Sequence, residues 1–186
     1  LLGYSLAGDF DYEGDGVPDV LIGAPGADYG GVDSGRCYLL SPVGGVTWTV
    51  DGPAALSSFG FSVAWIGDLD GDLYQDFLAG APDATPGIHP EAGQATAFSG
   101  ATRATLWSYS GNRPSAHLGH AVAGGRDLDG DSVPDFAFAA PGATPGGSAA
   151  AGAIEVHSGA GGALLYRLAG TDPYDRLGFA LALVED

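Results

Sequence analysis

Hydrophobic and polar residues alternate in short runs along much of this 186-residue chain, and the runs end at Gly, Pro or Asp. Runs such as "TAFSG" (96–100) and "IEVHSG" (154–159) have the period of half-buried strands. The runs "SVAWIG" (62–67) and "FLAGAP" (77–82) are more uniformly apolar, so we expect them to lie deepest. No run has a sustained helical period. The pattern therefore predicts an all-β chain of short strands.

The same pattern returns about every 60 residues. Glycines at 3, 60, 119 and 178 open similar segments, 57, 59 and 59 residues apart, and each complete unit has four predicted strands. A period of this length points to a propeller or another repeat array. We predict one repeat domain, 1–186, made of propeller blades of four antiparallel strands. Three full blades and the first strand of a fourth occupy units of about 1–57, 58–116, 117–175 and 176–186.

The number of units does not show how a closed propeller ring would form. Propellers usually have four to eight blades, and three blades leave two unpaired edges. Three explanations fit: a longer parent chain, assembly between chains, or a terminal strand that completes a neighbour's blade. The 186 residues contain no Met and no visible signal peptide, so we expect a mature product or an excerpt.

Composition narrows the possible partners. The formal net charge is −17, from 23 acidic residues and six basic residues that are all Arg. Such a surface repels nucleic acid and anionic membranes, and no apolar stretch is long enough to span a bilayer. We therefore predict neither nucleic-acid binding nor membrane insertion. Cys37 is the only cysteine, so no disulfide forms within the chain, and we expect a buried thiol on a strand.

Three loops hold 12 of the 23 carboxylates: "DYEGDGVPD" (11–19), "DLDGDLYQD" (68–76) and "DLDGDSVPD" (127–135). Alternate residues of a tight loop direct oxygens at one centre, and Ca²⁺ takes six to eight oxygens. We expect Leu69 and Leu73 to face into the blade. The predicted ligands are Asp11, Glu13, Asp15 and Asp19; Asp68, Asp70, Asp72 and Asp76; and Asp127, Asp129, Asp131 and Asp135, with turns at Gly14, Gly71 and Gly130.

Asp and Gly are also ordinary turn residues, so one such loop alone is compatible with a solvated turn. Three loops in register favour a metal, because each close pair of like charges costs about 1–4 kcal/mol. Three Ca²⁺ ions would change the formal charge from −17 to −11. Mg²⁺ and Zn²⁺ fit less well. An EF-hand needs Glu at loop position 12, where Ala79 and Phe138 stand.

The motifs around these loops resemble the FG-GAP repeat of integrin α-subunit propellers and of bacterial surface proteins. Phe59-Gly60 supplies the FG pair, and Gly23-Ala24-Pro25 and Gly80-Ala81-Pro82 supply the GAP triplet. The resemblance covers essentially the whole chain. It implies four strands per repeat, Ca²⁺ in the hairpin that joins the first two, and backbone carbonyl ligands at Val17, Tyr74 and Val133. The departures are Glu13, Ala139 in place of the GAP glycine, and the incomplete fourth unit.

No catalytic set is visible, because the four histidines are scattered and no nucleophile or phosphate-binding motif occurs. His117 and His120 replace Ser58 and Phe61 of the preceding unit, which we interpret as repeat variation. Trp48, Trp65 and Trp107 are interpreted as core or blade-to-blade packing.

We predict a non-enzymatic calcium-binding propeller segment, extracellular or on the cell surface, used for adhesion, protein–protein interaction or assembly. The alternatives are a lectin-like propeller with sugars between its blades, and an accessory propeller of a secreted hydrolase. The partner, a protein or a glycan, is not identified, and self-assembly through the open blade edges is a further option. The first side chains to test lie on loops opposite the acidic hairpins: Tyr29, His89, Arg113 and Tyr174.

Overall fold

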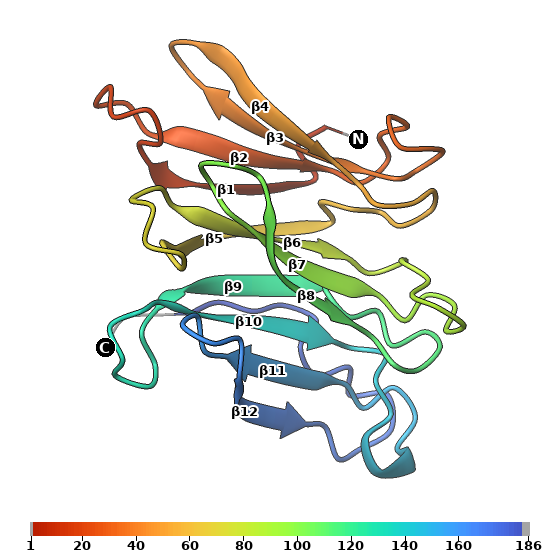
Figure 1. Ribbon diagram of the computed structural model, residues 1–186. Coiled ribbons are helices and arrows are strands. Elements are labelled where there is room, and N and C mark those ends of the chain that lie inside the picture. The colour runs from red at the N-terminus through yellow and green to blue at the C-terminus, as the bar shows by residue number, and fades with distance from the viewer. Residues whose placement is uncertain (1, 184–186) are drawn as a thin grey trace.

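Within residues 2–183, which the computed structural model describes, twelve strands form three four-stranded antiparallel sheets (Figure 1). Each sheet follows chain order, β1-β2-β3-β4, β5-β6-β7-β8 and β9-β10-β11-β12, and a short 3₁₀ turn lies at Pro145–Gly147. The predicted all-β fold of four-stranded blades is confirmed. The strands are β1 (Ser5–Phe10), β2 (Asp19–Ala24), β3 (Arg36–Ser41), β4 (Gly45–Asp51), β5 (Ser62–Gly67), β6 (Asp76–Ala81), β7 (Gln94–Phe98), β8 (Thr105–Ser110), β9 (Ala121–Arg126), β10 (Asp135–Ala140), β11 (Ala153–His157) and β12 (Leu164–Ala169).

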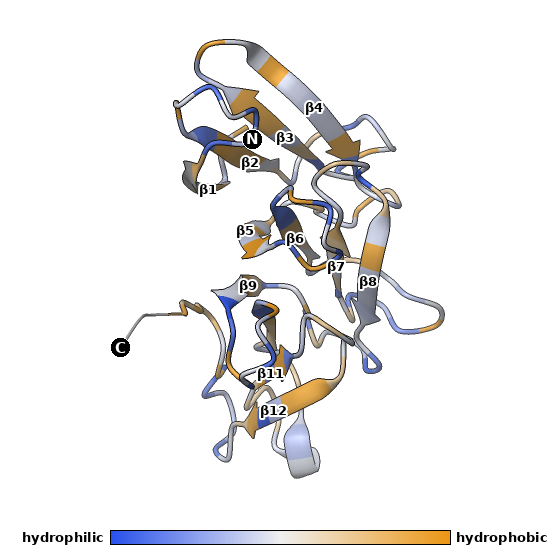
Figure 2. Ribbon diagram, turned by 60° about the vertical axis from the view of Figure 1, so that its left-hand side comes forward, coloured by the Kyte–Doolittle hydropathy of each residue, from blue (hydrophilic) through white to orange (hydrophobic). Residues whose placement is uncertain are grey.

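The three sheets stack face to face, with β5 in contact with both β1 and β9. Figure 2 shows β1 and β5 on one side of the stack and β4 and β8 on the other. None of the described residues forms a helix long and apolar enough to cross a membrane.

The core lies between neighbouring sheets. Leu39 and Trp48 of the first blade pack against Phe77 of the second, in one cluster of buried residues. Leu78 of the second blade packs with Phe136 of the third in another. All residues of β6 and β10 are buried, as expected for the uniformly apolar second strands, whereas β5 is only partly buried. The tryptophans lie in or against these clusters, and Cys37 is a buried free thiol.

The start of each new unit contacts the preceding blade through the same kind of β-bridge. Gly35 forms a parallel bridge with Phe59, and the pairs Gly93–Leu118 and Gly152–Leu177 repeat this contact at the next two junctions. The amide nitrogen of Gly52 donates to the carbonyl of Gly35 over 2.9 Å. These bridges hold the start of each new unit beside the residue that precedes the third strand of the blade before it. Strands β5 and β9 then lie against the first and second strands of that blade.

The fourth unit departs from this arrangement. Leu177 makes its bridge, but 178–183 form no strand, so the strand expected over 178–184 is absent from the described part of the chain. In the three complete units, the first strand pairs with the second strand of the same unit. Ala139 stands where the other units have the GAP glycine, and a β-carbon built on Gly178 would lie only 2.5 Å from the Ala139 β-carbon.

Candidate metal centre

The three acidic segments are the hairpin loops that join the first two strands of each blade, and they project from one side of the stack (Figure 1). The aspartate at the first position of each loop organises the turn. Asp68 accepts hydrogen bonds from the amides of Gly71, at 2.7 Å, and Leu73, at 2.9 Å. Asp127 repeats both bonds with Gly130 and Ser132, and Asp11 repeats them with Gly14 and Gly16.

The aspartate at the last loop position begins the second strand and is fully buried. Asp76 accepts from the amide of Leu69 at 2.7 Å and from that of Gly100 at 2.8 Å. Asp135 makes the equivalent bonds to the amides of Leu128 and Gly159. Burial raises the pKa of Asp76 to about 6, against the lowering effect of the two amide bonds. Each buried carboxyl therefore ties its loop to the third strand's end.

Two loops bring three of their four predicted carboxylates together. Carboxylate oxygens of Asp68, Asp70 and Asp76 lie within 4.8 Å of one another. The same holds for the third blade, with Asp127, Asp129 and Asp135. The fifth-position residues Asp72 and Asp131 lie outside these groups, and each accepts a hydrogen bond from the amide of Tyr74 or Val133. The structure therefore assembles two of the three predicted centres in part.

The first loop is built differently. The carboxylate of Glu13 accepts a hydrogen bond from the hydroxyl of Thr47 on β4, and the described residues of this loop form no carboxylate group like the other two. Asp15 accepts from the amide of Val17 at 2.8 Å. Asp19 is fully buried and accepts from the amide of Tyr12, but its second oxygen, Oδ1, has no hydrogen-bond partner.

The cause of this unpaired oxygen is one residue of the repeat. Pro42 occupies the position of Gly100 and Gly159, whose amides donate to the equivalent aspartates. Proline has no amide hydrogen, so Asp19 loses the bond that its counterparts make. A buried carboxylate oxygen without a donor is costly unless a cation or water faces it. The orphaned oxygen is therefore compatible with a bound cation at the first loop as well.

The donor set fits a hard divalent cation. All grouped ligands are carboxylate oxygens, with no His or Cys among them. Hydrogen bonds from backbone amides, that of Gly130 first, lower the pKa of Asp127, so this carboxylate stays ionised near neutral pH. Oxygen-only donors suit Ca²⁺ and disfavour Zn²⁺.

Two expectations about neighbouring side chains have different outcomes. Leu69 packs against the second core cluster, as expected. The expectation that Leu73 faces into the blade is wrong, because its side chain is 90% exposed. Its φ of 74° turns the chain outward, as glycine does at the same position of the first loop.

The four candidate recognition residues lie on loops at the other end of the strands, but they do not converge. Tyr29 is exposed and its ring lies 3.3 Å from the guanidinium carbon of Arg36. Tyr174 is exposed as well, yet neither it nor His89 or Arg113 lines the two large cavities found at that end. One of these cavities is lined by His117 and His120, which sequence comparison within the repeat marked only as variable positions.

Comparison with known proteins supports the repeat assignment. The family model described as FG-GAP repeat matches residues 2–40 and 118–156. These two stretches of the chain belong to the FG-GAP repeat family. The resemblance found in its motifs is thus confirmed, and the two matched stretches each contain an acidic loop with the strands on both sides of it.

Curated relatives of this FG-GAP chain are integrin alpha subunits. Integrin alpha-PS2 of Drosophila melanogaster is 36% identical over 160 residues, which is 74% of this chain and 11% of the relative. Integrin alpha-PS3 of the same species is 30% identical, and the match covers 76% of this chain and 13% of the relative. Human integrin alpha-IIb is 32% identical, and the match covers 72% of this chain and 14% of the relative. The chain therefore spans only about a tenth of the length of these relatives.

Proposed function

We propose that this FG-GAP chain is a non-enzymatic, calcium-binding propeller segment that acts outside the cell or at its surface in adhesion or protein interaction. The observation that carries the proposal is the pair of three-carboxylate groups, at equivalent positions of the second and third blades. One acidic turn is common in proteins without a metal. The same residue types in the same geometry, on two blades of one stack, are better explained by a shared ligand.

Calcium would act on the fold through the first hairpin of each blade. Asp70 and Asp129 approach the buried Asp76 and Asp135, so each group joins an exposed turn to the start of a fully buried strand. A bound divalent cation offsets the repulsion among these carboxylates and holds the turn against the blade. Extracellular modules bind Ca²⁺ with dissociation constants of roughly 10⁻⁴–10⁻³ M, which suits a millimolar environment.

The relatives suggest the biological setting. All of those named above are integrin alpha subunits, and the chain matches only a small share of each, so adhesion and a cell-surface location are carried over here as part of the proposal. The rigid stack of blades presents long loops at the end opposite the acidic hairpins, where a partner would bind.

The outer face of the third blade is a second candidate for a partner. Tyr166 and Leu168 are 57% and 54% exposed, and they stand at the repeat positions of Trp107 and Tyr109, which pack against the third blade. An apolar sheet face of this kind is suited to cover by another sheet. We propose that a further blade of the same repeat packs here. Light scattering at low and high calcium would show assembly if that blade comes from a second copy.

The test of calcium binding is isothermal titration of CaCl₂ into the wild-type chain and three variants. Asp70→Asn and Asp129→Asn should each weaken one site by about tenfold or more, because each removes a charge from one group. Asp172→Asn, in an exposed loop between blades, is the matched control and should bind as the wild type does. Absence of binding at millimolar Ca²⁺, or equal binding by all four proteins, would contradict the proposal.

A further inference from the structure

Two cavities of similar size lie between neighbouring blades. The first inter-blade cavity, about 560 Å³, lies between blades one and two and includes Tyr4, Pro25 and Phe61. The second inter-blade cavity, about 570 Å³, lies between blades two and three and includes Phe61, Pro82 and His120. Both are lined by residues at the start of first strands and the end of second strands, so they lie at the opposite end from the acidic loops. Their volumes are typical of small-molecule sites.

Rings and prolines form the walls of the second inter-blade cavity. The ring of His120 lies between those of Phe61 and Phe179, with centroid distances of 4.9 Å and 4.5 Å. Pro82 and Pro141 add further apolar surface. The Nδ1 atom of His120 is buried and has no hydrogen-bond partner. The cavity therefore offers aromatic and aliphatic surface together with one unsatisfied ring nitrogen.

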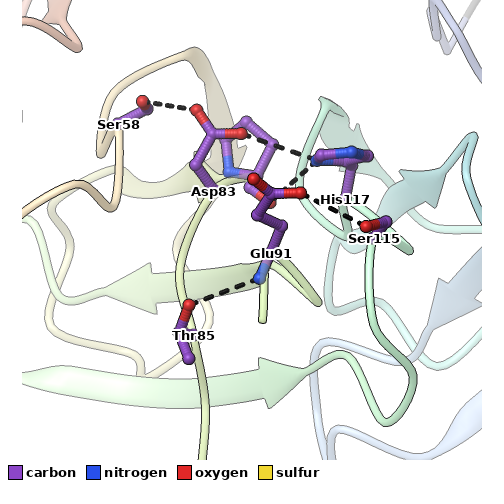
Figure 3. A network of polar contacts seen from close by, with 7 residues as sticks. Ser58, Asp83, Thr85, Glu91, Ser115 and His117 are labelled. Carbon is purple, nitrogen blue, oxygen red and sulfur yellow. Dashed lines mark hydrogen bonds and ion pairs between the residues drawn. The ribbon is translucent and has the colours of Figure 1, made fainter. Parts of the chain in front are cut away.

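A fixed carboxylate marks the polar part of this cavity (Figure 3). Asp83 accepts a hydrogen bond from the hydroxyl of Ser58 at 2.6 Å, and its other oxygen lies 3.5 Å from Nδ1 of His117. The same ring nitrogen lies 3.3 Å from the carbonyl oxygen of Pro82. Neighbours on both sides therefore hold Asp83 in place. An ionised carboxylate accepts about four hydrogen bonds, so Asp83 retains capacity for a ligand's donors.

The charges along the second inter-blade cavity balance. Asp83 brings one negative charge, and Arg176, an exposed side chain that makes no ion pair within residues 2–183, brings one positive charge. Burial lowers the pKa of His120, which keeps its ring neutral near pH 7. The first inter-blade cavity differs, because Asp33, Asp83 and Glu91 line it without an Arg, Lys or His. The two cavities should therefore select different ligands.

We propose that the second inter-blade cavity binds a neutral pyranose ring of a glycan. A strongly anionic ligand would meet Asp83, and a strongly cationic one would meet Arg176. A purely apolar ligand would leave the His120 nitrogen without a partner and would remove water from the charged Asp83 and Arg176, which is costly. A pyranose supplies hydroxyl donors and acceptors for these groups and an aliphatic C–H face for Phe61 or Phe179. This site is separate from the proposed calcium loops.

Saturation-transfer NMR of the wild-type chain in calcium buffer tests the proposal. The probes are methyl pyranosides of glucose, galactose, mannose, N-acetylglucosamine and N-acetylgalactosamine, with methyl glucuronide and a methyl aminosugar as charged comparators. At least one neutral pyranoside should show transfer and a millimolar or tighter dissociation constant. Transfer from none of them, or from charged sugars alone, would overturn the assignment.

Variants taken from the repeat itself locate the site. The double variant His117→Ser, His120→Phe installs the residues of the preceding unit, Ser58 and Phe61, and the backbone at 117 and 58 has the same φ, 53° and 54°. It should weaken pyranoside binding by about tenfold or more, since two imidazole rings and their polar nitrogens are lost. The exposed Arg176→Gln should weaken binding too, and it provides the test if the double variant does not fold.

Asp33→Asn, in the first inter-blade cavity only, is the matched control and should leave the dissociation constant within about twofold. Wild-type affinity in both the double variant and Arg176→Gln would contradict the proposal. An equal loss of pyranoside affinity in Asp33→Asn would also contradict it.

Discussion

The carbonyl oxygen of Gly60 lies 1.9 Å from the position that a β-carbon on Gly23 would occupy. The same oxygen accepts a hydrogen bond from the hydroxyl of Ser5 at 2.8 Å. The pair Gly80 and Gly119 repeats this approach, also at 1.9 Å. The glycine of the GAP triplet is therefore the residue that lets the next blade's first strand come into backbone contact.

Replacing one of these glycines should loosen the stack. Gly80→Ala forces the Gly119 carbonyl away, so we expect the free energy of unfolding to fall by about 3 kcal/mol. Urea denaturation followed by tryptophan fluorescence measures it. Gly161→Ala is the control, because nothing lies within 4 Å of its added β-carbon. Equal effects of the two changes would show that the close approach is not required.

The exposed Leu73 occupies a backbone conformation that suits glycine. Its φ is 74° and its side chain is 90% exposed, so Leu73→Gly removes steric strain of about 1–2 kcal/mol without loss of packing. Greater freedom of the unfolded chain offsets part of this gain, and we expect a net stabilisation of about 0.5–1 kcal/mol. Ile88→Gly, 86% exposed at ordinary φ, should destabilise. A loss of stability in both variants would refute the strain at Leu73.

The unpaired oxygen of Asp19 predicts a stabilising substitution at a proline. Pro42→Ala supplies the missing amide while it keeps a β-carbon, and a hydrogen bond to a charged group is worth about 1.5–3 kcal/mol. After the entropy cost of losing proline, we expect a gain of about 1 kcal/mol in calcium-free buffer. Pro53→Ala, at an exposed position, controls for that cost and should destabilise slightly. Thermal unfolding compares the two variants, and equal destabilisation would contradict the account.

The buried Asp76 predicts a pH dependence of the calcium-free protein. The pKa of an Asp in the unfolded chain is about 3.9, whereas burial raises the pKa of Asp76 to about 6. Between these values the folded protein binds more protons than the unfolded chain, so this group's contribution makes stability fall as pH rises from about 4 to about 6. Asp76→Asn should remove that part of the slope in denaturation curves. An identical slope in wild type and variant would show that Asp76 does not titrate in this range.

The sequence made the blades predictable because each unit repeats the same alternation and the same turn residues. It also located the carboxylates that meet in the second and third loops. It did not show how the carboxylates of the first loop are hydrogen-bonded. Their hydrogen bonding depends on Pro42, which follows the third strand, and on Thr47 in the fourth strand. These partners come together only through strand pairing, so spacing along one loop could not reveal them.

Other features depend on packing between blades. The predicted strand of the fourth unit looked equivalent to the other first strands, but 178–183 form no strand, and Ala139 and Ala121 replace the glycine and serine found at the other junctions. His157 occupies the position of Phe98 and is buried, with its two ring nitrogens 3.0 Å from the Gly162 carbonyl and 3.2 Å from the Glu155 carboxylate. A pattern of hydrophobic positions gives no sign of such partners.

The most direct measurement is the thermal unfolding of the 186-residue chain in millimolar CaCl₂ and in excess chelator. If calcium holds the first hairpins to their blades, chelation should lower the melting temperature by many degrees, and added CaCl₂ should restore it. Asp70→Asn with Asp129→Asn should shrink the difference between the two conditions. Superimposable melting curves of the wild-type chain with and without calcium would contradict a structural role for the metal.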